Sequence, residues 1–164
     1  MGRAVSRRAA DRERALEALR EARDGGDAVR LGERLDAALA GDHGRSIALA
    51  AAICAERLLH DREPGLIAAF RRLAASPHDR DPGCPGKRAL LRALLDLDCL
   101  DADFFREALG VTQPEPIWGG RRDTAADVRG TAALGLAATG HGRALVDLAP
   151  VLWDPEPAAR QGAA

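Results

Sequence analysis

The feature that most constrains the fold is a short phrase that occurs twice near the C-terminus. Residues 123–133 read DTAADVRGTAA and residues 154–164 read DPEPAARQGAA. In each copy an Asp opens the phrase, an Arg follows six positions later, and a Gly and two Ala residues come close behind. The two arginines, Arg129 and Arg160, are 31 residues apart. Such a period is typical of stacked helical hairpins, each of which buries its apolar face against the next.

The composition favours helices along the whole chain. The 164 residues are enough for one domain with its own core. Tyr and Asn are absent and β-branched residues are few, which favours helix over strand. No segment carries the signal of a strand, so the sequence predicts an all-α protein. The formal net charge of −1 argues against general attraction to nucleic acid or to a membrane surface.

Apolar residues at helical spacing, bounded by turn residues, predict about eight helices. They cover residues 4–24, 28–40, 44–59, 64–76, 87–97, 102–109, 125–138 and 143–153. Asp27 and Asp101 are expected to cap helices, and Thr124 with Asp127 resembles a capping box. Pro150 lies inside the last apolar pattern and is expected to kink or shorten that helix. Two long loops, 76–86 and 110–122, are expected to join one hairpin to the next.

An Asp opens each unit of the predicted repeat. The openings are Asp42, Asp81, Asp123 and Asp154, and a basic residue, Lys87, follows Asp81 at the same six-residue interval as in the two C-terminal copies. We therefore divide one domain, 1–164, into an N-terminal capping hairpin (1–40), three repeats (41–76, 81–110 and 123–153) and the start of an incomplete repeat (154–164).

Residues 123–164 resemble a HEAT repeat and the start of its successor. The features that carry the resemblance are Asp123 before the first helix, Val128 and Arg129 one turn in, small residues from Ala132 to Gly135, and a Leu-rich second helix. The match is looser over residues 42–110, where Asp42 has no basic residue six positions later, and weak before residue 40.

The resemblance implies a right-handed α-solenoid of stacked helical hairpins (HEAT/armadillo-like), with a truncated C-terminal repeat. It implies a function in binding and scaffolding and no reaction. It also implies that the Asp and Arg residues of the motif form a ladder between neighbouring repeats. We therefore expect a structural role for four residues: Asp123, Arg129, Asp154 and Arg160.

The sequence offers no convincing catalytic or metal-binding constellation. His78, Asp79, Asp81 and Cys84 share a loop, but a structural zinc site would want paired Cys or His spacing, so we expect a solvated connection. Cys54 and Cys99 lie in apolar segments and are expected to be packing residues with reduced thiols. We predict no enzyme activity, no metal and no cofactor.

Trp118 with Arg121 and Arg122 is the most interesting polar and aromatic group. Trp and Arg are enriched at binding hot spots, so an exposed Trp118 is a candidate partner anchor. The alternative, which we favour from the sequence, is that Trp118 folds back over the helix of Phe104 and Phe105 and seals the loop.

The favoured function is a non-catalytic, protein-binding scaffold module. The alternative is a nucleic-acid-binding or DNA-repair solenoid, which requires basic residues to converge on a concave surface; the candidates are Arg71, Arg72, Arg121, Arg122 and Arg143. A third hypothesis is an accessory subunit that contacts its partner through the two long loops, which should emerge along one edge. The N-terminus has no apolar segment of a secretory signal, and the longest apolar run is far shorter than the roughly 20 residues of a membrane span. The expected location is cytoplasmic.

Overall fold

The computed structural model describes residues 2–76 and 78–164, with side chains from residue 9 onward. In that part of the chain it contains nine α-helices, three short 3-10 helices and one pair of strands. The elements, in chain order, are α1 (Gly2–Asp24), α2 (Ala28–Ala40), α3 (Gly44–Glu56), η1 (His60–Arg62), α4 (Glu63–Ala74), η2 (His78–Arg80), α5 (Pro85–Asp96), α6 (Ala102–Leu109), β1 (Pro114–Ile117), β2 (Gly120–Asp123), α7 (Ala126–Ala138), α8 (Ala144–Leu148), η3 (Ala149–Trp153) and α9 (Pro157–Ala163).

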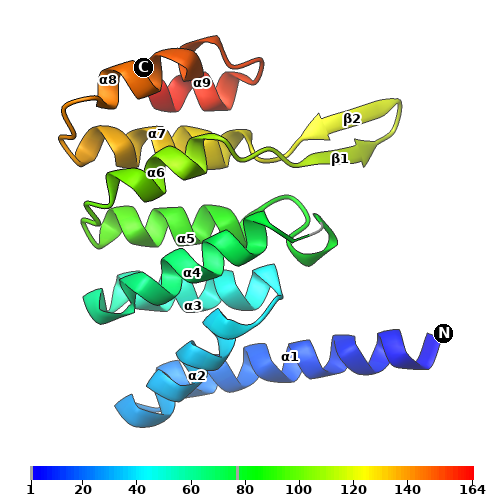
Figure 1. Cartoon of the computed structure of the whole chain (residues 1–164). Coiled ribbons are helices and arrows are strands. Elements are labelled where there is room, and N and C mark those ends of the chain that lie inside the picture. Colours follow the sequence, from blue (N-terminus) through cyan, green and yellow to red (C-terminus); the bar gives the residue numbers. More distant parts are fainter. Residues whose placement is uncertain (1, 77) are drawn as a thin grey trace.

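The helices are arranged in layers (Figure 1). The odd-numbered helices follow one another in one layer, where α3 packs on α5, α5 on α7, and α7 on α9. The helices α2, α4 and α6 cross them in a second layer and pack on α3, α5 and α7 respectively. The connections that lead into α5, α7 and α9 emerge along one edge of this arrangement.

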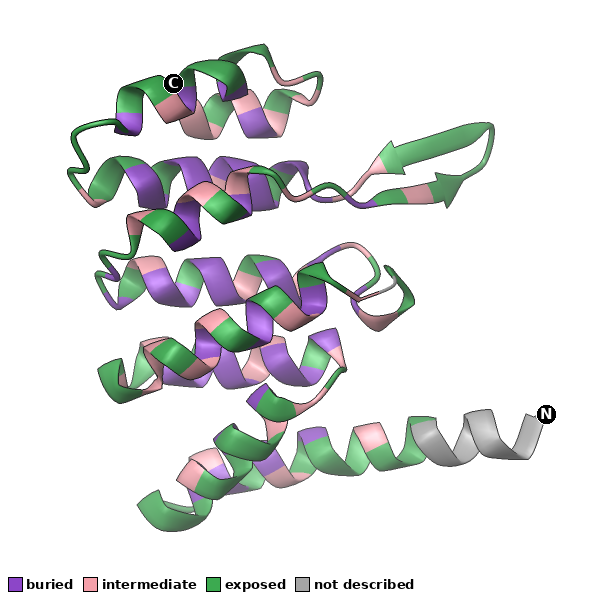
Figure 2. Cartoon of the chain, viewed as in Figure 1, coloured by how far each residue is buried: buried purple, intermediate pink, exposed green. Residues whose placement is uncertain are grey.

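One continuous apolar core runs between the layers, from α1 to α8. The buried residues in Figure 2 accordingly lie where helices face one another. Phe70 and Phe104 meet edge to face, with ring centroids 5.2 Å apart, and Phe105 follows at 5.3 Å from Phe104. Such pairs add specificity of geometry to the burial of area. The three cysteines are free and buried, so Cys54 and Cys99 are packing residues as predicted, and burial raises the pKa of the Cys54 thiol to about 11.

At two crossings of the first layer, α3 with α5 and α7 with α9, the helices approach so closely that only glycine fits. A Cβ atom added to Gly86 would lie 2.9 Å from the Cα atom of Gly44, a distance that real Cβ atoms essentially never show. A Cβ atom on Gly162 would clash with the backbone of Gly130 in the same way. The Gly of the repeated C-terminal phrase is therefore a contact residue: Gly130 of the first copy touches Gly162 of the second.

The predicted helix boundaries are mostly confirmed, with one wrong cap. The Asp27 carboxylate accepts the N–H groups of Val29 and Arg30, and Asp101 accepts that of Phe104. The last predicted helix is shortened at the proline, because α8 ends at Leu148 and a 3-10 helix continues to Trp153. The capping box is wrong, because no side chain caps α7 and the Thr124 hydroxyl binds other partners.

The prediction of no strand is wrong for residues 114–123, which form an antiparallel hairpin. The segment reads as loop because its strands are only four residues long and contain two prolines, whose ring nitrogens cannot donate to a ladder. No helix of the described residues has the length and apolar character that crossing a membrane requires.

Candidate functional site

The β1–β2 hairpin projects beyond the helices, on the edge where the connections into α5, α7 and α9 lie (Figure 1). Its strands pair from Pro114 with Asp123 to Ile117 with Gly120, so Trp118 and Gly119 form the two-residue tip. Gly119 has a φ of 86°, a left-handed value that glycine adopts without steric cost. The tight tip therefore places Trp118 at the far end of the hairpin.

Trp118 is completely exposed, with a relative exposure of 102%. The interpretation that Trp118 folds back over Phe104 and Phe105 is wrong, because both phenylalanines are fully buried while Trp118, at the tip of the projecting hairpin, is fully exposed. Ile117 beside it is 53% exposed. A large aromatic side chain in water is what a partner anchor requires, because its burial against a second protein releases the most apolar area.

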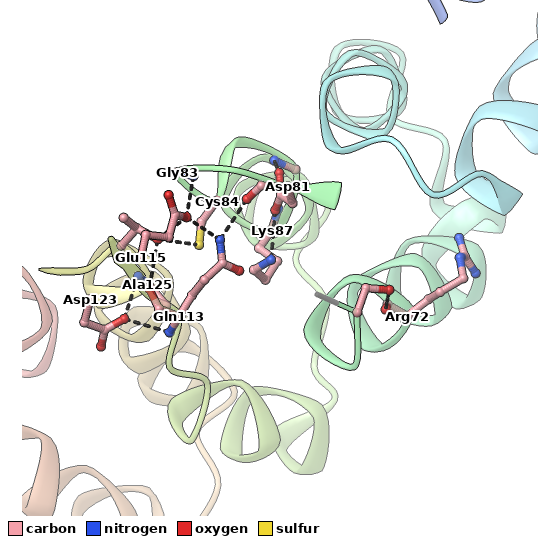
Figure 3. A network of polar contacts seen from close by, with 12 residues as sticks. Arg72, Asp81, Gly83, Cys84, Lys87, Gln113, Glu115, Asp123 and Ala125 are labelled. Atoms are coloured by element: carbon pink, nitrogen blue, oxygen red, sulfur yellow. Dashed lines mark hydrogen bonds and ion pairs between the residues drawn. The ribbon is translucent and has the colours of Figure 1, made fainter. Parts of the chain in front are cut away.

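A hydrogen-bonded network fixes the base of the hairpin (Figure 3). One carboxylate oxygen of Glu115 accepts the backbone N–H of Gly83 at 2.7 Å, the amide of Gln113 at 2.6 Å and the hydroxyl of Thr124 at 2.7 Å. Burial opposes the charged form of Glu115, but these three donors and the charge of His78 hold its pKa below the ordinary value. Ionised Glu115 therefore links the hairpin to Gly83 in the loop before α5, and we call these hydrogen bonds the Glu115 clasp.

The loop that contains Gly83 also contains one residue of a buried ion pair. The Gln113 amide donates to the backbone oxygen of Asp81 at 2.9 Å, and the Asp81 carboxylate lies 3.0 Å from the Lys87 ammonium. Asp81 also accepts the N–H groups of Gly86 and Lys87 at the start of α5. Each charged side chain of the pair is only 1% exposed. The base of the hairpin is thus hydrogen-bonded to a loop whose own ion pair is buried.

The expectation of a solvated connection is wrong for two of the four residues singled out in loop 76–86. Asp81 and Cys84 are buried, whereas His78 and Asp79 are exposed; Pro77 lies outside the described residues. Burial raises the pKa of the Cys84 thiol, whose sulfur lies 3.5 Å from the Thr124 hydroxyl. In the described ranges, no three His, Cys, Asp or Glu residues come together in a way that holds a metal ion.

The repeated Asp and Arg residues meet in a second network, at the junction of α7 and α9. The Arg129 guanidinium contacts the Asp123 carboxylate at 2.5 Å and the Asp154 carboxylate at 2.7 and 2.9 Å. It also donates to the backbone oxygen of Val111 at 3.0 Å. Arg160 donates to the backbone oxygen of Asp154 at 2.7 Å. Arg129 therefore joins Asp123, which precedes α7, to Asp154, which precedes α9.

These contacts predict acid sensitivity. The Asp154 pKa lies below its ordinary value of 3.8 because Arg129 donates to the carboxylate. Burial opposes ionisation of Asp123, but the N–H groups of Gln113 and Ala125, with Arg129, hold its pKa below that value too. A depressed folded-state pKa contributes stability that is complete above the unfolded-state pKa and lost as pH falls through the folded-state value.

We therefore expect the free energy of unfolding, measured with urea, to decrease as pH falls below about 4. Replacing Arg129 by Met should flatten this slope. Replacing Arg20, which forms an exposed pair with Glu17, provides the matched control and should leave the slope intact. A wild-type slope in the Arg129 variant would contradict the assignment.

The structure does not bring the predicted basic residues into one stripe. Arg71 pairs with Glu107 at 2.8 Å. Arg72 is half-buried and donates to the backbone oxygens of Leu39 and Gly41 at the end of α2. Arg143 follows the C-terminal end of α7, whereas the hairpin precedes its N-terminal end, about 20 Å away at 1.5 Å per residue.

Only Arg121 and Arg122 lie with Trp118, on β2 of the same hairpin. Both are exposed, and the Arg121 guanidinium donates to the backbone oxygen of Pro114 at 2.9 Å. Sequence reasoning missed Glu115 and Gln113, which form the clasp, because nothing in the local pattern marks them. The Asp81-to-Lys87 interval, by contrast, was a usable signal, because it repeats the Asp123-to-Arg129 spacing.

A second exposed apolar group lies on the C-terminal hairpin. Leu145, Val146 and Trp153 are 84%, 63% and 88% exposed. Trp153 belongs to η3, which follows α8, and lies on a different element from Trp118. The chain therefore contains two exposed tryptophans in different settings, one on the clasped hairpin and one on the last helical turn before α9.

Comparison with known proteins adds no relative: no protein-family model matches the chain, and the searches of curated proteins and of solved structures give no significant match.

Proposed function

We propose that this chain is a non-catalytic, protein-binding scaffold module, built as a right-handed α-solenoid of HEAT type. The helical hairpins supply a rigid frame, and the clasped β1–β2 hairpin presents the binding residues. Trp118 is the anchor, and Arg121 and Arg122 flank it. The partner is another protein.

Contacts between successive hairpins support the repeat architecture. Ion pairs join residues separated by roughly one repeat: Arg71 with Glu107 at a separation of 36, Arg80 with Asp42 at 38, Arg88 with Asp127 at 39, and Arg106 with Asp147 at 41. Arg129, whose side chain is 6% exposed, adds a further link to Asp154 over a separation of 25 residues. Nearest-neighbour contacts of this type are how stacked repeats acquire their stability.

The proposed function rests on the exposure of Trp118 at the tip of a hairpin whose base is held by hydrogen bonds. Leaving an indole ring in water gives up the stabilisation that its burial would bring, about 25 cal/mol per Å² of apolar area. The ring is presented by a hairpin whose base has three hydrogen bonds to one carboxylate oxygen. A preorganised anchor loses little conformational entropy on binding.

The placement of the arginines favours protein over nucleic acid as the partner. Binding along a phosphate backbone needs several cations along one track, because each contact releases counterions. Arg71 and Arg72 are engaged with other groups, and Arg143 lies at the far end of α7. Two neighbouring arginines beside one Trp suit a compact protein contact instead.

We expect Trp118→Ala to weaken the capture of a stoichiometric protein partner strongly when the chain is used as bait in native extract. Burial of a central Trp typically contributes at least 2 kcal/mol to binding, so capture should fall by at least about 30-fold. Trp153→Ala is the matched control, because Trp153 is also exposed but lies on another element. Mass spectrometry of the captured protein, with and without nuclease, is the measurement.

Capture that survives nuclease and depends on Trp118 alone supports the proposal. Loss of the captured material on nuclease treatment would assign the surface to nucleic acid. Equal capture by the Trp118 and Trp153 variants would show that the hairpin is not the binding site.

A further inference from the structure

The two outer edges of the β1–β2 hairpin differ in their hydrogen-bonding capacity. The Thr124 N–H donates to the Gln113 oxygen at 3.0 Å in the position of a ladder hydrogen bond, while the Gln113 N–H donates to the Asp123 carboxylate. Bonded and non-bonded pairs alternate, so Pro114 with Asp123 and Pro116 with Arg121 are non-bonded pairs. The backbone groups of these residues face outward.

The outer edge of β1 cannot accept another strand, whereas the outer edge of β2 can. Pro114 and Pro116 occupy the two outward positions of β1, and a proline has no N–H to donate. Arg121 and Asp123 occupy the outward positions of β2, and their N–H and carbonyl groups face away from β1. An exposed strand edge with free donors and acceptors is a template for pairing with another chain.

The charges on β2 select which chain pairs there. The Arg121 guanidinium donates to the backbone oxygen of Pro114 on β1 at 2.9 Å, so its contact is with a neutral carbonyl, and in the described part of the chain neither Arg121 nor Arg122 is paired with a carboxylate. Glu115, directly opposite Arg122, is already engaged by its three donors. A second copy adding through its own β2 would place arginine beside arginine, which is destabilising. Carboxylates in the adjacent strand are favourable, so the edge suits an acidic segment rather than another copy.

The base of this edge opens into a cleft with room for such a segment. The cleft has a volume of about 480 Å³ and is lined by Arg122 and Thr124 from the hairpin, by Arg88 of α5 and Asp127 of α7, which form an ion pair, and by Glu156 and Pro157 before and within α9. Arg88 neutralises Asp127, but Glu156 adds a negative charge at this end, so the carboxylates of an incoming segment belong nearer the tip.

We propose that an extended, acidic segment of a partner protein adds to the outer edge of β2 as a third strand. Successive residues of a strand project to opposite faces, so Arg121 and Arg122 require two consecutive acidic residues, one for each face. In the incoming segment, apolar residues next to the two acidic residues would lie near Ile117 and Trp118 at the tip of the hairpin. This inference rests on the proposed protein-binding function and names its mode, which is strand addition.

The test uses short synthetic peptides and the Trp153→Phe protein, in which Trp118 is the only one of the two tryptophans left. The first probe is a valine- and threonine-rich peptide with two consecutive glutamates, and the second carries two lysines instead. Calorimetry and Trp118 emission are the readouts. We expect the glutamate peptide to bind, R121E/R122E to weaken its binding by at least about tenfold, and the same variant to bind the lysine peptide.

Backbone methylation separates strand addition from contact through side chains alone. In the glutamate peptide, N-methyl groups are placed on alternate residues in either of two phases. Only one phase faces β2, so we expect one methylated peptide to lose binding and the other to retain it. Equal binding by both would overturn strand addition.

Other outcomes are equally decisive. Binding of both charge types with equal affinity, or of a short oligothymidylate in preference to the glutamate peptide, would overturn the proposal. If no peptide binds while partner capture remains dependent on Trp118, strand addition is wrong and the protein-binding function stands. If capture is also independent of Trp118, both proposals fail.

Discussion

Asp81→Ala is expected to lower the free energy of unfolding by about 3–5 kcal/mol, because it leaves a buried charge without its partner. The Lys87 ammonium is 1% exposed and lies 3.0 Å from the Asp81 carboxylate. The substitution also removes the acceptor of the Gly86 and Lys87 N–H groups at the start of α5. Urea unfolding at neutral pH, followed by circular dichroism, measures the loss.

Two further variants define the cause. Asp42→Ala removes an exposed carboxylate that pairs with Arg80, and such pairs contribute about 0–1 kcal/mol. Lys87→Met should cost less than Asp81→Ala, because Asp81 keeps its two N–H donors and the Met side chain fills the space. If Asp81→Ala costs no more than Asp42→Ala, the buried pair does not stabilise the fold.

Arg129→Met is expected to have a loss of similar size, about 3–5 kcal/mol. The Arg129 side chain is 6% exposed and bridges the carboxylates of Asp123 and Asp154. Without it, two partly buried negative charges lie close together and the Val111 oxygen loses a donor. Because Asp154 precedes α9, we also expect α9 to detach from α7, which hydrogen exchange of residues 157–163 would report.

Arg160 provides the matched control from the other copy of the repeated phrase. It is half-buried, and its contacts within the described residues are donated hydrogen bonds to the backbone oxygens of Asp154 and Pro155. Arg160→Met should therefore cost about 1 kcal/mol. Arg129→Lys should recover only part of the loss, since an ammonium cannot reproduce the two-pronged contact with Asp154. Equal losses for Arg129→Met and Arg160→Met would contradict the bridging role.

The Asp81 and Arg129 variants also distinguish effects on the stability of the helical fold from effects on the proposed binding surface. Asp81 lies at the base of the hairpin, because its backbone oxygen accepts the Gln113 side-chain amide. The same amide donates to Glu115, which also accepts the Gly83 N–H. A variant at Asp81 should therefore loosen the attachment of the β1–β2 hairpin as well as lower the stability of the fold. Arg129 acts at the junction of α7 and α9, so its loss should reduce stability with a smaller effect on the presentation of Trp118.

Helices were predictable because their signals are local. The apolar spacing of α2 and α4, the caps at Asp27 and Asp101, and the shortening at Pro150 all depend on residues within about one turn of one another. The repeated phrase likewise marked Asp123, Arg129 and Asp154, although the contacts among them became visible only in three dimensions.

The sequence by itself thus determined that the chain is helical, roughly where its helices begin and end, and that its C-terminal units share one Asp and Arg pattern. Tertiary structure alone decided that Asp81 is buried, that residues 114–123 form a hairpin, and that Trp118 faces water. The physical reason is distance along the chain. Glu115 is clasped by Gly83, 32 residues earlier, and Arg129 is held by Asp154, 25 residues later. Such contacts leave no periodicity in a local segment, because the partner that selects the conformation is supplied by another part of the fold.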